Sequence, residues 1–108
     1  MPGATTHVPD LAARVEMPAD GIHSVTVHED TSHKAVLFAF AAGEGLSEHT
    51  ASKPAILQLI AGRMRWTLGN ETIAAEPGAW ASMAAGLPHA LHAETDAKML
   101  LILVQEPD

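Results

Sequence analysis

The β character of this chain is set by residues 43–62, which read GEGLSEHTASKPAILQLIAG. The stretch begins with a glycine-bounded turn, carries a single histidine, His49, breaks at Pro54 and continues as an apolar run of strand length. Residues 78–92, GAWASMAAGLPHALH, repeat this order of features and place His89 just after a glycine and a proline. Glycine and proline are turn residues that punctuate β structure. The two segments therefore predict two β units that bring His49 and His89 into one pocket.

The composition is that of one globular domain with an aliphatic core. The chain has 108 residues, of which 47% are hydrophobic and 18% are charged, and this excludes a disordered protein. It has only two phenylalanines and two tryptophans. Alanine, leucine, isoleucine, valine and methionine must therefore build most of the core. We expect Trp66, Trp80, Met64, Met83 and Met99 to serve as packing residues.

The charge and the missing cysteines exclude several classes of function. The formal net charge is −7, and the six lysines and arginines are scattered, whereas nucleic-acid binding and anionic membrane surfaces require clustered cations. Without cysteine there is no disulfide, no thiolate zinc ligand and no thiol nucleophile. Residues 1–10 do not resemble a signal peptide, and no apolar run approaches the ~20 residues of a membrane-spanning helix. We expect a cytoplasmic protein with no nucleic-acid and no membrane partner.

Short alternating segments between turn signals predict an all-β fold. Residues 22–28 and 63–68 alternate in the two-residue period of a half-buried strand, and Gly69-Asn70 is typical of a tight hairpin. Further strands are expected at 35–41, 55–61, 72–74, 80–83, 89–93 and 99–104. Closely spaced short strands indicate a sandwich or barrel. Residues 1–21 are predicted to form a partly loose N-terminal arm, and residues 22–108 to form the β domain.

The two punctuated segments resemble the two motifs of the cupin family, which has a double-sheet jelly-roll fold. The first family motif is Gly, five residues, His-x-His, three or four residues, Glu, six residues, Gly, and it is matched here by Gly43, His49 and Gly62. The second is Gly, five residues, Pro-x-Gly, two residues, His, three residues, Asn, and it is matched by Gly78, Gly86 and His89. The resemblance covers about residues 22–104. It implies a double-stranded β-helix of about eight short antiparallel strands, like that of the small, mostly uncharacterised cupin-domain proteins.

The chain departs from both motifs at positions that matter for chemistry. Alanine replaces the second histidine, the glutamate, the proline and the asparagine of the family, at Ala51, Ala55, Ala84 and Ala93. Family members with the full set use three histidines and one glutamate to hold a divalent metal such as iron, manganese, nickel or zinc. Only His49 and His89 match, whereas a catalytic metal generally has three protein ligands. The resemblance therefore implies an incomplete metal site held by these two histidines.

Alanines at the ligand positions predict a pocket that is largely apolar. Its expected lining is His49, Ala51, Ala55, Leu57, His89 and Leu91. A pocket without cations favours a small, partly apolar ligand over a sugar phosphate. His23, His28 and His33 are expected to be ordinary strand or turn residues, and His92 a solvated or interface residue.

Three classes of function are left open by these residues. The favoured class is a small-ligand binding protein, and the alternative is a divalent-metal-dependent enzyme of oxygenase or isomerase type. The third class is a structural jelly roll with a vestigial pocket. A histidine pair could also move protons near neutral pH without a metal. Small cupins often pair, and outward-facing Ile56 and Ile60 would leave an apolar surface, so a homodimer is predicted.

Overall fold

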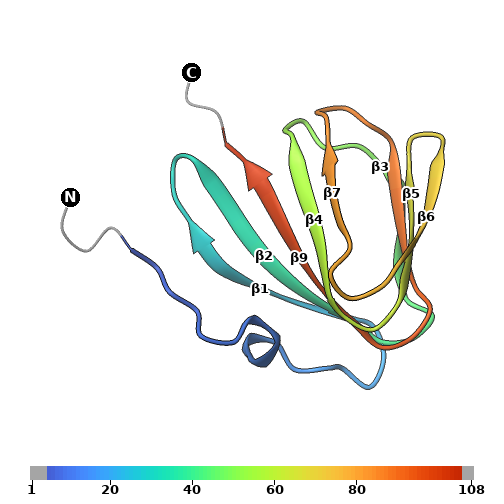
Figure 1. Cartoon of the computed structure of the whole chain (residues 1–108), viewed down its shortest axis with the longest axis horizontal. Helices are drawn as coiled ribbons and strands as arrows, with labels where there is room; N and C mark the ends of the chain where they lie inside the picture. The colour runs from blue at the N-terminus through green and yellow to red at the C-terminus, as the bar shows by residue number, and fades with distance from the viewer. Residues whose placement is uncertain (1–4, 106–108) are drawn as a thin grey trace.

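The computed structural model describes residues 5–105, and nearly all of its regular structure is β (Figure 1). A short 3-10 helix, η1 (Leu11–Arg14), precedes nine strands. The strands are β1 (Ile22–Glu29), β2 (His33–Phe40), β3 (Gly45–His49), β4 (Ala55–Ala61), β5 (Met64–Leu68), β6 (Glu71–Ala75), β7 (Trp80–Met83), β8 (His89–Ala93) and β9 (Ala97–Val104). Within residues 5–105, no helix has the length and apolar character needed to cross a membrane.

The strands form two antiparallel sheets, as expected for a jelly roll. One sheet has the order β1-β2-β9-β4-β7, and the other has the order β3-β8-β5-β6 (Figure 1). The predicted all-β jelly roll is confirmed, with nine strands in place of the expected eight or so. The hydrogen-bonded ladders stop at the sheet edges, so the two sheets do not close into one continuous barrel. The strand that was not predicted is β3.

The core lies between the inner faces of the two sheets. Alternation along each strand sends one set of side chains inward, as shown by Leu57 and Leu59 on β4 and by Met64 and Trp66 on β5. Met83 and Met99 are buried with them, as expected. Full burial of such a side chain contributes roughly 1.5–3 kcal/mol, so these residues dominate the stability of the fold.

A second apolar cluster covers the outer face of the five-stranded sheet. Leu37, Ala39 and Leu100 point outward there and pack with Val15 and Met17 of the N-terminal segment. The ammonium of Lys98 also donates a hydrogen bond to the carbonyl oxygen of Ala12. The segment runs alongside β1 and β2 in Figure 1. Leu11, Val15 and Met17 of the predicted arm are thus packed. Residues 1–4 lie outside the described part of the chain, and the boundary at residue 21 stays a prediction.

The turn between β4 and β5 depends on glycine at position 62. Gly62 has φ of +79°, which side chains with a Cβ rarely adopt. A Cβ built there would also collide with the backbone carbonyl oxygen of Asp96 and with the backbone of Ala97. The cupin-like motif position is therefore occupied by glycine for two separate steric reasons.

The two tryptophans lie in opposite environments. Trp66 is fully buried between the sheets, as predicted for a packing residue. Trp80 is 60% exposed on β7, which is an edge strand of the five-stranded sheet. The expectation that Trp80 packs in the core is wrong, because alternation on this short edge strand buries Met83 and turns Trp80 away from the core.

Candidate functional site

His49 and His89 lie opposite each other on neighbouring strands. They are paired residues in the antiparallel ladder of β3 and β8. Their ring centroids are 4.1 Å apart, with an angle of 61° between the ring planes. The fold thus brings together the two histidines that come from the two separate motifs.

A β-bulge puts His49 on the correct side of the sheet. Leu46 pairs with Leu91, and both face the core, but the register shifts before His49 pairs with His89. In an uninterrupted strand, a residue three positions after Leu46 would point to the opposite face. The extra residue of the bulge turns His49 to the same face of the sheet as Leu46, where its ring contacts that of His89.

Both imidazoles are held in the same way by the backbone. The Nδ1 atom of His49 lies 2.8 Å from the carbonyl oxygen of Ser47, and that of His89 lies 2.9 Å from the carbonyl oxygen of Leu87. A carbonyl oxygen can only accept a hydrogen bond, so each Nδ1–H is the donor. The Nε2 atom of each neutral ring then keeps its lone pair for an external partner. The same anchoring is used by histidines that bind metals.

The pair lies where β3 ends and β8 begins. His89 is only 6% exposed, whereas His49 is exposed to solvent. The loops that follow His49 and precede His89 are joined by a hydrogen bond from the amide of Gly86 to the carbonyl oxygen of Ala51. His49 is therefore the solvent-facing member of the pair, and His89 the sheltered one.

The remaining residues of the predicted lining are divided between the core and the rim. Ala55, Leu57 and Leu91 are buried in the cluster between the sheets and contact their neighbours there. Ala51 is half-buried in the loop beside the histidines. Accessible surface at this end of the fold thus comes from His49 and Ala51 and from the adjoining loops.

A groove borders the histidine pair. It has a volume of about 790 Å³ and runs between the edges of the two sheets. Glu48, which precedes His49, and Leu87 and Pro88, which precede His89, line it. Glu71 is the other charged residue of the lining. The remaining lining residues are apolar or uncharged, and they are Leu68, Gly69, Asn70, Ile73, Ala81 and Ser82. No cation lines this groove among the described residues.

Comparison with known families identifies the fold family. Residues 36–105 match the family model described as the cupin domain. The chain belongs to the cupin family. This confirms the resemblance to a small single-domain cupin that the two motifs predicted.

Solved structures similar to this cupin include several proteins without an assigned role. A conserved protein of unknown function from Streptococcus pyogenes is 27% identical with a TM-score of 0.85, over 96% of this chain and 91% of the other. A cupin 2 conserved barrel domain protein from Leptotrichia buccalis is 30% identical with a TM-score of 0.80, over 87% of this chain and 46% of the other. No curated protein matched the sequence.

One similar structure has a described ligand. It is a salicylate 1,2-dioxygenase variant from Pseudoaminobacter salicylatoxidans in complex with gentisate. Its identity to this cupin is 16% and its TM-score 0.73, over 81% of this chain and 27% of the dioxygenase. A similarity at this level shows the shared fold alone.

The donor set in this cupin does not fit the metal centre of the fully equipped family members. The positions of their second histidine and their glutamate are occupied by Ala51 and Ala55, neither of which has a donor atom in its side chain. Ala55 is also buried in the core. Two imidazoles therefore stand alone where a catalytic metal generally has three protein ligands.

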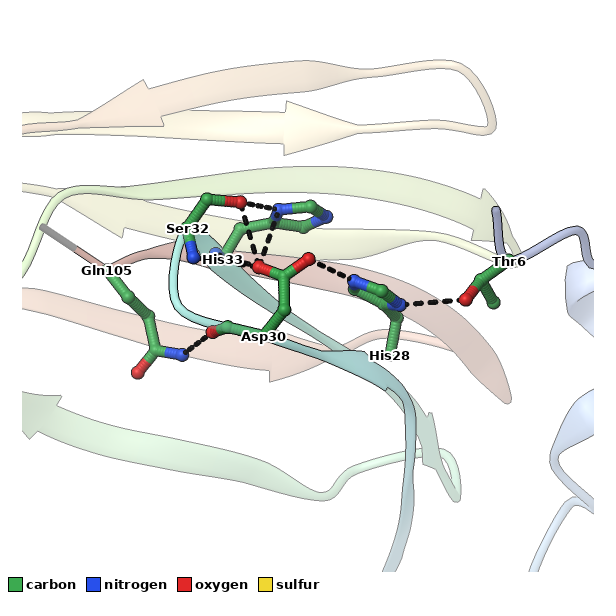
Figure 2. Close-up of polar contacts among 6 residues, drawn as sticks. All are labelled: Thr6, His28, Asp30, Ser32, His33 and Gln105. Atoms are coloured by element: carbon green, nitrogen blue, oxygen red, sulfur yellow. Dashed lines mark hydrogen bonds and ion pairs between the residues drawn. The ribbon is translucent and has the colours of Figure 1, made fainter. Parts of the chain in front are cut away.

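A second group of polar side chains lies in the turn between β1 and β2 (Figure 2). His28 Nε2 is 2.7 Å from Asp30 Oδ2, and His33 Nδ1 is 3.6 Å from Asp30 Oδ1. The hydrogen bonds from His28 and then from Ser32 and the backbone hold the pKa of the Asp30 carboxyl well below its ordinary value. His28 and His33, expected to be ordinary strand or turn residues, thus belong to one polar cluster around Asp30. The spacing His-x-Asp-x-x-His across a tight turn was the signal that could have identified the group.

Proposed function

We propose that this cupin is a binding protein for a small, partly apolar ligand, which it holds at the His49–His89 pair. The observation that carries the proposal is the anchoring of both Nδ1–H groups on backbone carbonyls, which leaves Nε2 as the acceptor of each ring, in two rings whose centroids are 4.1 Å apart. Two fixed acceptors are complementary to a ligand with two hydrogen-bond donors. Because they are preorganised by the backbone, little conformational entropy is lost on binding.

The groove beside the pair narrows the chemical class of the ligand. Leu68, Ile73 and Leu87 would contact the apolar part of a ligand. Glu48 and Glu71 are the charged residues of the lining, so an anionic ligand would be repelled. The proposed ligand is therefore uncharged or cationic, with hydrogen-bond donors at one end and an apolar body.

A metal-dependent oxygenase or isomerase is the less well supported alternative. The anchored Nδ1–H groups would suit metal ligation. However, positions 51 and 55 are alanines, and among residues 5–105 no third histidine or carboxylate joins the pair in a possible metal site. The cytoplasmic location and the absence of nucleic-acid and membrane partners stay predictions from composition.

Substitution of His49 by alanine is expected to weaken ligand binding about tenfold, because loss of one net hydrogen bond of about 1–1.5 kcal/mol corresponds to that factor. His49 is exposed, so the variant should fold. Binding is measured by NMR with a library of small neutral and cationic amphipathic compounds, following the ¹⁵N shifts of both Nε2 atoms.

The matched control for this test is His92→Ala. His92 lies on β8, three positions after His89, on the opposite face of the same sheet. Its removal should leave affinity unchanged. The proposal fails if compounds bind His49→Ala as tightly as the wild type, or if no compound in the library moves either Nε2 signal.

We further propose that the chain forms a homodimer through the outer face of β4 and β7. Trp80 is 60% exposed on the edge strand, opposite Gln58 of β4, and Ile56 is half-buried on the same face of β4. Ile60, in contrast, packs against the outer cluster that includes the N-terminal segment. An exposed tryptophan beside an apolar strand face is typical of an interface.

The variant Trp80→Glu is expected to be monomeric at micromolar concentration, where the wild type sediments as a dimer. A buried glutamate at such an interface would lose its hydration without a partner. Thr72→Glu, an exposed change on β6 of the other sheet, should remain dimeric. A monomeric wild type, or a Trp80→Glu variant that stays dimeric, would contradict the proposed interface.

A further inference from the structure

We propose that the turn between β1 and β2 is a binding site for one divalent transition-metal ion, with His28, Asp30 and His33 as its protein ligands. Each residue offers one ligand atom, and these atoms all lie within 4.8 Å of one another. The site is separate from the His49–His89 pair, and the inference does not depend on the ligand proposed there.

The turn itself fixes the carboxylate. Asp30 Oδ1 accepts hydrogen bonds from the amide of Ser32 at 2.7 Å, the hydroxyl of Ser32 at 2.8 Å and the amide of His33 at 3.0 Å. This self-contained pattern holds the aspartate in one orientation. Its second oxygen, Oδ2, points to His28 Nε2 (Figure 2). The oxygen that would bind a metal is therefore positioned by the same turn that joins the two strands.

The two imidazoles meet across the hairpin. Their rings are stacked with centroids 4.8 Å apart and an interplanar angle of 28°. The ligand atoms of a tetrahedral zinc site lie roughly 3.3–3.6 Å from one another, given metal–ligand bonds of about 2.0–2.2 Å. His28 Nε2 and Asp30 Oδ2 are now 2.7 Å apart, and the three ligand atoms all lie within 4.8 Å of one another. The first pair must move apart and the widest pair must approach, each by on the order of 1 Å, to admit an ion. The ion would replace the hydrogen that now joins His28 Nε2 and Asp30 Oδ2.

A second layer of contacts already orients the proposed ligands. Thr6 Oγ1 lies 3.0 Å from His28 Nδ1. When Nε2 of this ring binds a metal, Nδ1 carries the hydrogen and can donate a hydrogen bond to the Thr6 hydroxyl oxygen. Gln105 Nε2 donates to the backbone oxygen of Asp30 at 2.7 Å and ties the turn to the chain beyond β9 (Figure 2). Such outer contacts fix the tautomer and orientation of metal ligands.

There is room and access for an ion with bound water. A groove of about 470 Å³ lies over the three residues, and Thr5, Thr6 and Leu11 of the N-terminal segment form part of its wall. Each of the three ligand side chains is partly exposed. Water can therefore complete the coordination of an ion that has three protein ligands.

The donor set selects the class of metal. Two imidazole nitrogens and one carboxylate oxygen suit zinc, cobalt, nickel or copper, whereas calcium and magnesium prefer oxygen ligands throughout. Binding would join β1, β2 and the N-terminal segment around one ion. By mass action, the ion would then raise the thermal midpoint of the folded chain.

The test is titration of the untagged full-length protein with Zn²⁺ by calorimetry, and with Co²⁺ by visible absorption. We expect one equivalent to bind, with affinity reduced at least tenfold in His28→Ala and in His33→Ala. Both variants keep the Asp30 turn, so far-UV circular dichroism should show that they fold.

Two controls separate this site from other histidines. His23→Ala, an exposed change on β1, and the double variant His49→Ala/His89→Ala should bind the metal like the wild type. The proposal is overturned if the wild type binds neither ion, or if His28→Ala and His33→Ala bind as tightly as the wild type. It is also overturned if the loss occurs only in the double variant, because the ion would then lie at the other pair.

Discussion

Replacement of Gly62 by alanine is expected to lower the free energy of unfolding by roughly 3–5 kcal/mol, a large part of the 5–15 kcal/mol typical of a domain. The positive φ of this residue accounts for about 1–2 kcal/mol of that loss. The larger part comes from the new Cβ, which would overlap the carbonyl oxygen of Asp96 and the backbone of Ala97. These atoms cannot move easily, because Ala97 is buried at the start of β9.

The matched control is Gly78→Ala, and the measurement is urea unfolding. Gly78 also has a positive φ, of +97°, but a Cβ built there meets nothing within 4 Å. The free energy of unfolding of Gly78→Ala should therefore fall only by the cost of the positive φ, about 1–2 kcal/mol. Equal losses in the two variants would mean that the backbone around Asp96 moves aside, contrary to the prediction.

Substitution of Trp66 by alanine is expected to cost about 3–5 kcal/mol, the range for removal of a large buried aromatic side chain. Trp66 is fully buried and lies between Ile73 and Leu91 on the adjacent strands. The cavity would open in the centre of the core, where both sheets contribute side chains. Urea unfolding measures the loss directly.

The variant Trp66→Phe tests which part of the side chain matters. The indole Nε1 of Trp66 is buried and has no hydrogen-bond acceptor within residues 5–105. An unpaired buried donor carries a penalty of about 1–3 kcal/mol, which phenylalanine would remove. We therefore expect Trp66→Phe to retain most of the stability that Trp66→Ala loses. A phenylalanine variant as unstable as the alanine variant would contradict this account.

Strands with a regular period were predictable from the sequence. The segments 80–83 and 89–93 coincide with β7 and β8, because each is bounded by turn residues and reads apolar in alternation. Strand β3 was missed because Ser47, Glu48 and His49 form no apolar alternation and a bulge breaks the period. A bulge is specified by pairing with another strand, which a single sequence does not display.

The candidate site was predictable in part. Motif spacing predicted that His49 and His89 share one site, but not the backbone contacts that anchor the Nδ1 atom of each ring. Alternation predicts that Leu57 and Leu91 lie on the inner faces of their sheets. It does not predict that side chains of the opposite sheet cover them, because that depends on packing between the sheets. The His28–His33 contact was missed although its spacing is visible in the sequence, because it depends on how the turn folds around Asp30.

The order of strands in the larger sheet has a consequence for synthesis. Strand β9, the last in the sequence, lies between β2 and β4 and pairs with both. During synthesis, the edges of β2 and β4 that pair with β9 therefore stay unpaired until β9 leaves the ribosome. Pairing of β9 with β2 also requires closure of a long loop. A nascent chain that stalls before Ala97 would present two unpaired β edges, which is the form most prone to aggregate.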